Sequence, residues 1–200
     1  FGGVLSHGAF MESSNYGNSD TFLHLGKARL HCPEPGAWAP DPRKKGDGKQ
    51  WLQVDLGRTC LVGGVQTQGS KGFDEMTTAY EVLVGDDAGA KGAVQATSAD
   101  SGTTSFVGNS DSDTVETRLF KAPLLGRYVR FVVKEWGGKL EPALRVEVLK
   151  GERSNRGGER GAVAVSASLY SPVKRRHLTN DGTLGASAEP APYTLEFEGP

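Results

Sequence analysis

The stretch that most constrains the fold of this chain is residues 49–57, with the sequence KQWLQVDLG. Bulky side chains occur at both odd and even positions of this stretch, and Gly57 ends it. This pattern predicts a strand that is buried on at least one face and ends in a turn. Such a strand needs apolar walls for Trp51, and hydrogen-bond donors or a cation for Asp55 if that carboxylate lies inside.

Composition extends this prediction to the whole chain. Glycine supplies 28 of the 200 residues, about twice the usual share of roughly 7%, and 10 residues are proline. No long apolar pattern of helical period is present, so short strands joined by turns are expected. Their spacing, with no helices between them, indicates an antiparallel β-sandwich or barrel. The further strands expected cover residues 61–68, 79–84, 115–120, 128–134 and 144–149.

Charge and motifs exclude several functional classes. Lys plus Arg number 23 and Asp plus Glu number 24, so no net field favours nucleic acid or an anionic membrane. No apolar run approaches the roughly 20 residues of a membrane-spanning helix. The 4 histidines are scattered, and none stands in a recognisable arrangement with a serine and an acid. These patterns predict a protein that is not an enzyme.

The character of the chain changes at Gly151. Residues 1–151 are predicted to form one β domain, and residues 152–161, rich in charge and glycine, a linker. Residues 162–169 alternate like a strand, residues 180–182 form an Asn-Asp-Gly turn, and residues 193–197 again resemble a strand. Residues 162–200 are therefore predicted to be the start of a second β domain. A tail packed on the first domain is the alternative. Because the chain begins at Phe1, we expect it to be part of a longer protein.

Cys32 and Cys60 are the two cysteines of the chain, and neither stands in a zinc-binding spacing. The residues alone leave two interpretations open. The two cysteines form one disulfide in an oxidising compartment, or both are small buried apolar side chains.

Short motifs follow one another along the chain: ARL at 28–30, AW at 37–38, QWLQVDLG at 50–57, VQTQG at 65–69, FVGN at 106–109, RYVR at 127–130 and ALRVE at 143–147. Their order and spacing resemble the discoidin domain, the type C module of coagulation factors V and VIII. The resemblance covers about residues 5–150. It implies an all-β, antiparallel, jelly-roll-like β-sandwich of the galactose-binding-like fold, and a module that binds ligands without catalysis.

The chain departs from this family in its cysteines. The family usually joins its two ends by a disulfide, but here residues 150–152 are Lys-Gly-Glu and no cysteine precedes Cys32. If Cys32 pairs with Cys60, the disulfide of this module brackets the Trp51 strand instead.

In the family, ligands contact loops at one end of the sandwich, so the resemblance implies a binding site there. Tyr16 and Phe73 are expected at loop tips, where an exposed ring favours contact with a partner. Acidic residues around them repel anionic lipid, so a protein or glycan partner is expected and membrane insertion is not. The predicted ligand-binding residues are Asn15, Tyr16, Lys71, Phe73, Asp74, Ser110 and Asp111.

A second set of residues is expected to hold the architecture. The tryptophans of this set are predicted to pack in the core and at its rim. The charged residues are predicted to form buried pairs, in which Arg29 or Arg145 neutralises Asp55. The predicted structural residues are Arg29, Trp38, Trp51, Asp55, Arg145 and Glu147.

No cofactor is expected, and calcium near Glu147 is the alternative. Bacterial sugar-binding relatives of the family hold a calcium ion with carbonyls and carboxylates, and Glu147 stands where the resemblance implies such a ligand. Discoidin-type members often replace the ion with an arginine, and Arg29 is available for that role.

These expectations together describe a noncatalytic adhesion or recognition module, extracellular or on the cell surface, that binds a protein or glycan through loops at one end. The alternative is a structural unit of a large multidomain filament, in contact with neighbouring domains of the same or a sister chain. A sugar-binding domain attached to an enzyme is a third interpretation. No nucleic-acid partner is expected.

Overall fold

The computed structural model describes residues 9–16, 27–30, 32, 35–44, 47–70, 72–138 and 141–151. Their regular structure is β-strand, and none of these residues forms an α-helix or a helix able to cross a membrane. The strands are β1 (Phe10–Glu12), β2 (Trp51–Gln68), β3 (Glu75–Gly85), β4 (Val94–Gln95), β5 (Phe106–Val107), β6 (Glu116–Gly138) and β7 (Arg145–Lys150). The predicted all-β fold class is confirmed.

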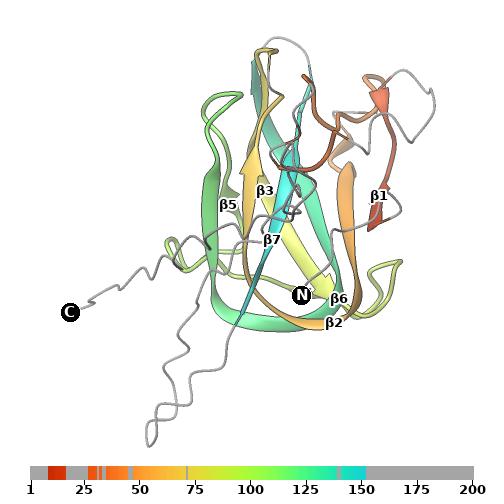
Figure 1. Cartoon of the computed structure of the whole chain (residues 1–200), viewed down its shortest axis with the longest axis vertical. Helices are drawn as coiled ribbons and strands as arrows, with labels where there is room; N and C mark the ends of the chain where they lie inside the picture. Colours follow the sequence, from red (N-terminus) through yellow and green to blue (C-terminus); the bar gives the residue numbers. More distant parts are fainter. Residues whose placement is uncertain are drawn as a thin grey trace, which may run out of the picture.

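Two long, bent strands, β2 and β6, build most of the structure. Residues 51–55 of β2 pair with residues 128–132 of β6, and residues 60–67 pair with residues 116–126. The register shifts between these two parts, where Gly57 has a φ of 74°, a conformation that glycine adopts without strain. At this corner both strands pass from one layer of the molecule to the other, along the lower edge of Figure 1. The expected strands at 49–57 and 61–68 are therefore two parts of one bent strand, and the expected turn at Gly57 is its corner.

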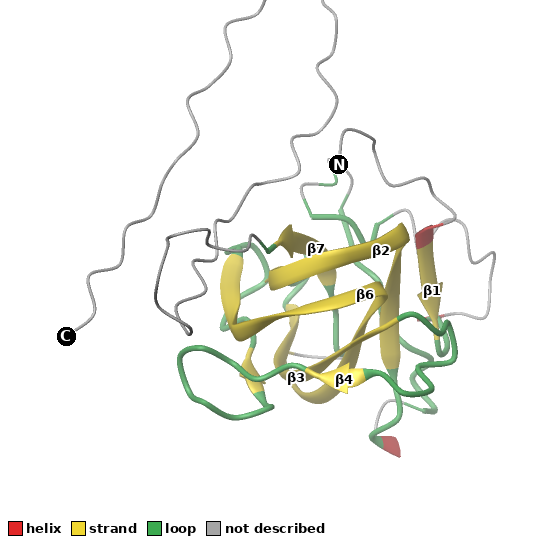
Figure 2. Ribbon diagram, turned by 90° about the horizontal axis from the view of Figure 1, so that it is seen from below, coloured by secondary structure: helices red, strands yellow, loops and turns green. Residues whose placement is uncertain are grey.

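All strand pairs are antiparallel, in the order β1–β2–β6–β3–β4, with β7 beside the second part of β2 and β5 beside β3. The segment 96–99 connects the layers on the other side. Ala96 N donates to Val82 O of β3 at 2.8 Å, and Ala99 N donates to Leu119 O of β6 at 2.9 Å. Figure 2 shows the strands arranged around a common interior.

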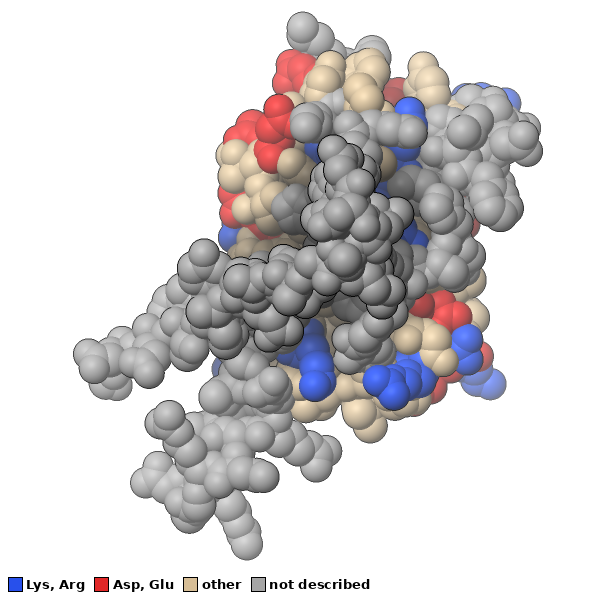
Figure 3. Space-filling view, in the orientation of Figure 1, with Lys and Arg blue, Asp and Glu red and all other residues tan. Residues whose placement is uncertain are grey.

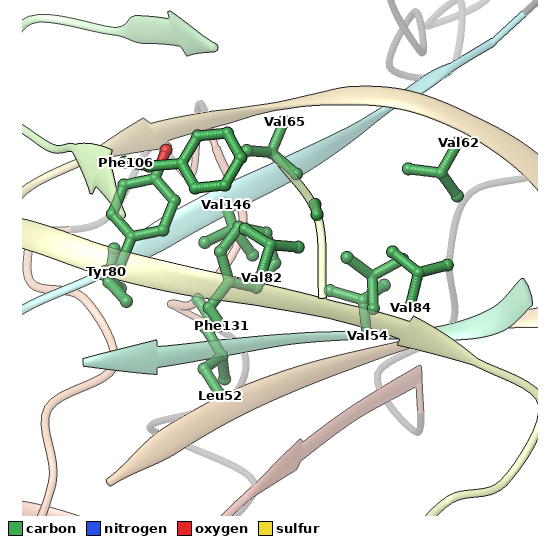
Figure 4. Packing of buried hydrophobic residues seen from close by; sticks show 14 of the residues in the cluster. Leu52, Val54, Val62, Val65, Tyr80, Val82, Val84, Phe106, Phe131 and Val146 are labelled. Atoms are coloured by element: carbon green, nitrogen blue, oxygen red, sulfur yellow. The ribbon is translucent and has the colours of Figure 1, made fainter. Parts of the chain in front are cut away.

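The inner faces of the strands enclose one hydrophobic core, part of which Figure 4 shows. The Tyr80 ring stacks on Phe106 with 5.6 Å between centroids, and Phe106 meets Phe120 edge-on at 5.7 Å. Trp38 is completely buried in the same core. Burial of each such large side chain contributes roughly 1.5–3 kcal/mol, so this cluster accounts for much of the stability.

Trp51 lies on the outer face of β2, where a cation covers it. The central carbon of the Arg130 guanidinium is 4.0 Å from the centre of the Trp51 ring. Arg130 is held there by hydrogen bonds from Nε to Gln53 Oε1 at 2.7 Å and from Nη2 to Ala88 O at 2.8 Å. Apolar neighbours were expected around Trp51. One side of the ring is instead covered by a planar guanidinium, which binds it through a cation–π contact.

The partner of Asp55 is Arg127, which corrects the prediction that Arg29 or Arg145 fills this role. Arg127 donates from Nε to Asp55 Oδ1 at 2.7 Å and from Nη2 to Asp55 Oδ2 at 2.8 Å. The pair is partly exposed, so the prediction of a buried pair is also corrected. The hydrogen bonds from Arg127 hold the pKa of the Asp55 carboxyl below its usual range, and a bond from Gly57 N adds to this effect.

Both cysteines are free thiols in this structure, which corrects the disulfide interpretation. Cys32 N donates to the carbonyl of Arg29, beside the beginning of β7. Cys60 lies two residues before Val62, which pairs with the last residue of β7. The thiols thus lie near opposite ends of β7, too far apart to be joined. Cys60 is buried, as the second interpretation expects, and burial raises the pKa of its thiol.

Some predictions fall on residues outside the described part of the chain. These are the ligand-binding role of Lys71, the linker at 152–161 and the β-rich segment at 162–200. The predicted domain boundary at Gly151 stays a prediction.

Candidate functional site

Three loops gather at the end of the molecule opposite the Gly57 corner. Because β2 doubles back at this corner, its first and last residues both lie at the loop end, the upper end in Figure 1. The loop at 13–16 lies beside the first residue of β2, and the loop at 69–74 continues from its last residue. The loop at 108–115 leads into β6, whose first residue pairs with Thr67 near the end of β2. This arrangement agrees with the predicted position of the three loops.

Hydrogen bonds fix the backbone of the loop at 13–16. Ser13 N donates to Trp51 O at 3.0 Å, and Tyr16 N donates to Ala39 O at 2.9 Å. The indole Nε1 of Trp38 donates to the carbonyl of Ser14 at 3.1 Å. The Tyr16 side chain nevertheless remains 47% exposed. The loop therefore presents an aromatic ring from a fixed backbone.

Gln50 organises this loop, although the sequence patterns assigned it no role at the site. Its side chain is buried, and Oε1 accepts hydrogen bonds from the hydroxyls of Ser13, at 2.9 Å, and Ser14. Its Nε2 donates to both carboxylate oxygens of Asp47 at 3.0 Å. This contact and a bond from Lys49 N lower the pKa of Asp47. A buried glutamine beside a strand start is a weak signal, and sequence alone does not show which hydroxyls it binds.

Asn15, a predicted ligand-binding residue, uses its amide inside the protein. Its Nδ2 donates to Glu12 Oε1 at 2.8 Å. Burial raises the pKa of Glu12, against the opposing effect of hydrogen bonds from Asn15 and Trp38. The Asn15 amide therefore supports a half-buried carboxyl at the base of the Tyr16 loop.

The loop at 69–74 is a tight turn with Phe73 near its tip. Ser70 N donates to Glu75 O and Phe73 N donates to Ser70 O, both at 2.9 Å, and Gly72 has a φ of 85°. Phe73 is 54% exposed, and Asp74 beside it is exposed. Burial raises the pKa of Glu75, and repulsion from Glu141 and Asp74 raises it further.

A fully buried arginine connects this loop to the loop at 108–115. Arg145, only 1% exposed, donates from Nε to Gly69 O at 2.8 Å and from Nη2 to Ser112 O at 3.5 Å. Asp113 lies 4.0 Å from its Nη2, and Gln68 Nε2 donates to the Asp113 carbonyl. Carbonyls rather than carboxylates are thus the main partners of Arg145, which corrects the prediction of a buried charge pair.

Two of the predicted ligand-binding residues lie in the third loop. Ser110 is exposed, whereas the carboxylate of Asp111 accepts hydrogen bonds within the loop itself. Asp111 Oδ1 accepts hydrogen bonds from Asp113 N at 2.8 Å and Thr114 N at 2.6 Å, and Oδ2 accepts from Thr114 Oγ1 at 2.7 Å. These bonds lower the pKa of Asp111. The carboxylate of Asp111 therefore stabilises the loop, and it also contributes negative charge at the loop end.

The segment 35–41, here called the strap, lies against both aromatic loops. A Cβ atom added to Gly72 would meet Pro35 at 3.6 Å, while the carbonyl of Ala39 accepts the hydrogen bond from Tyr16 N. Ala39 is four positions after Pro35, so these two residues lie at most about 14 Å apart. The strap therefore brings the Tyr16 and Phe73 loops to the same side of the loop end.

The region of Glu147 contains a carboxyl and a nearby cation. Burial raises the pKa of Glu147, against a hydrogen bond from Val148 N and the charge of Arg29. The Arg29 guanidinium also lies over the Phe10 ring, 5.4 Å from its centre. Within the described residues, no three His, Cys, Asp or Glu side chains gather as a metal site. Calcium binding near Glu147 stays a prediction.

Solved structures place this arrangement in a class of β-sandwich proteins. Discoidin II of Dictyostelium discoideum superimposes with a TM-score of 0.56 and 16% sequence identity, over 70% of this chain and 53% of that chain. A CBM32 module of Clostridium perfringens, solved in complex with GalNAc-β-1,3-galactose, gives a TM-score of 0.53 and 18% identity over 72% and 97%. The predicted discoidin-type, galactose-binding-like sandwich is confirmed.

The sequence defines the family. The model of the F5/8 type C domain matches residues 11–148, and the chain belongs to this family. Lactadherin of Rattus norvegicus is 33% identical over 131 residues, which are 64% of this chain and 28% of lactadherin. Retinoschisin of Mus musculus is 31% identical over 125 residues, which are 62% of this chain and 53% of retinoschisin. The matched part of this chain thus spans about half or less of the length of these relatives.

Proposed function

We propose that this protein is a noncatalytic recognition module, extracellular or on the cell surface, that binds a protein or glycan through its loop end. The observation that carries this proposal is the pair of half-exposed rings, Tyr16 and Phe73, on loops whose backbones are fixed by hydrogen bonds. Loops that are already ordered lose little conformational entropy when they bind. Aromatic side chains are also frequent anchors of binding interfaces.

The charges around Phe73 support a protein or glycan rather than an anionic membrane. Asp74, Asp111 and Asp113 are exposed on the two loops that Arg145 joins, while the positive charge of Arg145 is buried. Carboxylates at this position repel the negative surface of anionic lipids. The glycan in the structure of the CBM32 module with GalNAc-β-1,3-galactose supports a sugar as one ligand class for this fold.

The test is a double variant, Tyr16→Ala with Phe73→Ala. We expect it to weaken binding at least tenfold, because each interface anchor typically contributes more than about 1 kcal/mol. Binding is measured on a glycan array and by pull-down of cell-surface proteins, with and without calcium. Phosphatidylserine vesicles serve as the membrane probe, and weak binding to them is expected.

Val94→Ala is the matched control, because Val94 is also 54% exposed but lies on β4, away from the loops. Thermal unfolding of all variants checks that the fold is intact. The proposal is wrong if the double variant and the control bind every captured partner as strongly as the unmodified protein does.

A further inference from the structure

The end of the molecule opposite the loops carries an exposed apolar cluster, here called the corner patch. It consists of Leu61 of β2 with Pro123 and Leu125 of β6. Leu61 and Leu125 are register partners, so their side chains share one face of the sheet at a separation of about 5 Å. Leu125 is 59% exposed, and Leu61 and Pro123 are half-buried. Three adjacent apolar side chains at a sheet corner form a surface that a partner can cover.

The chain leaves the domain in contact with this patch. β7 ends at Lys150, and Gly151 N then donates to the carbonyl of Leu61 at 2.8 Å. A Cβ atom at position 151 would lie 2.9 Å from Pro123 Cβ and 3.2 Å from Leu61 Cγ, so only glycine fits here without displacement. The residues that follow Gly151 therefore start beside the corner patch.

An exposed lysine flanks the patch. Lys121 lies two positions before Pro123 on β6. Figure 3 shows Lys and Arg side chains at this lower end of the molecule. The occupant that this surface fits has a row of apolar side chains together with negative charge.

We propose that the corner patch binds the acidic segment at residues 178–200 of the same chain. This segment contains 4 acidic residues, Asp181, Glu189, Glu196 and Glu198, and no Lys or Arg. Its stretch YTLEF at 193–197 alternates, so an extended backbone places the apolar residues on one side and Thr194 and Glu196 on the other. The apolar row is complementary to the patch, and the acidic residues are complementary to Lys121 beside it. The apolar residues are Tyr193, Leu195 and Phe197.

The length of the chain permits this contact. A random coil of about 40 residues, the number between Gly151 and Tyr193, would have a root-mean-square span of about 32–38 Å. This span exceeds the short distance from Gly151 to the patch, so the segment can return without strain. Such tethering gives an effective concentration of the order of millimolar, at which a contact with a Kd below about 1 mM is mostly occupied.

The experiment uses the full chain with p-benzoylphenylalanine in place of Leu125. We expect irradiation to give an intramolecular crosslink, which peptide mass mapping locates within residues 178–200. Val107, 67% exposed on β5, carries the same photoreactive group in the matched control and is expected to give no such crosslink, because its register partner Ala79 lies in the part of β3 near the loop end. Crosslinks confined to residues 1–177, crosslinks only to a second copy, or no crosslink within the chain would each overturn the proposal.

Charge reversal provides a second readout. Lys121→Glu is expected to lower the crosslink yield several-fold, and adding Glu196→Lys is expected to restore it. A crosslink yield that is the same in both variants as in the unmodified chain contradicts the role of charge complementarity. The proposal goes beyond the proposed function, and its failure is distinguishable, because Tyr16→Ala with Phe73→Ala alters the other end of the molecule and leaves this crosslink unchanged.

Discussion

At the scale of single residues, three arginines of this domain carry out different structural tasks. Arg127 binds the carboxylate of Asp55 at the surface, Arg130 covers an indole ring, and Arg145 donates to loop carbonyls from inside the protein. The planar guanidinium serves each task because it offers several fixed donors and a flat face. Lysine, with a compact ammonium, reproduces none of these contacts fully.

The Asp55–Arg127 pair predicts a pH dependence. The pKa of Asp55 in the folded protein lies below its unfolded value, which is about 3.9. Its stabilising contribution is therefore present above about pH 4 and is lost as the pH falls through the folded pKa. We expect Asp55→Asn to be less stable than the unmodified protein at pH 7, with a smaller difference at pH 3. Urea unfolding at both pH values measures this.

The control for this measurement is Asp100→Asn, in an exposed turn, which is expected to change stability little at either pH. A stability difference for Asp55→Asn that stays constant from pH 7 to pH 3 would contradict the assigned role of the carboxylate.

The alternation at residues 51–56 was sufficient to predict the strand, but not the partners of its side chains. Asp55 meets Arg127 because β6 pairs with β2 in a register that shifts just beyond Asp55. The register of two strands about 70 residues apart depends on the whole core, and no local pattern encodes it. The resemblance to a family likewise provides the fold without the partner of each arginine.

At the scale of elements, the loops at 69–74 and 108–115 form one unit around Arg145. Gly69 adds to this unit, since a Cβ atom there would lie 2.7 Å from Glu75 O and 2.8 Å from Ser112 Cα. The sequence predicted that these loops lie at the same end. The sequence could not predict that the Asp111 carboxylate accepts hydrogen bonds from its own loop, because the short side chain of an aspartate binds either a ligand or the nearest free backbone N–H groups.

Arg145 variants test this unit. Arg145→Met removes both donors and leaves two loop carbonyls without their partner, so we expect faster amide hydrogen exchange in both loops and a cost of about 2–5 kcal/mol. Arg145→Lys retains the charge on a single nitrogen, which reaches Gly69 O or Ser112 O but not both, and is expected to loosen one loop more than the other. Exchange in the loop at 13–16 serves as the internal control, and equal changes in all three loops would contradict the specific role.

At the scale of the whole molecule, the two layers are held without a disulfide among the described residues. The bent strands β2 and β6 belong to both layers, and the segment 96–99 joins the layers on the opposite side. Gly151 fixes the end of β7 through a hydrogen bond to Leu61. The continuous strands and the segment 96–99 together provide connections between the layers that do not depend on a cross-link.

Thiol labelling tests the absence of the disulfide. The denatured protein, without reductant, is expected to incorporate two maleimide groups, because Cys32 and Cys60 are both free. In the native protein Cys60 is expected to react slowly, since it is buried and its thiol has a raised pKa. Intact-protein mass spectrometry counts the labels, and an unlabelled denatured chain would show that the two cysteines are joined.

The strap has a consequence for how recognition by this module can vary. Residues 35–41 belong to neither aromatic loop, yet Ala39 accepts a hydrogen bond from one loop and Pro35 lies beside Gly72 of the other. Substitutions in the loops alter what each ring and its neighbours bind, whereas a one-residue change in the length of the strap shifts one ring relative to the other by up to about 3.5 Å. The chemistry of each contact and the distance between contacts are therefore encoded in separate parts of the sequence, and each can change while the other stays fixed.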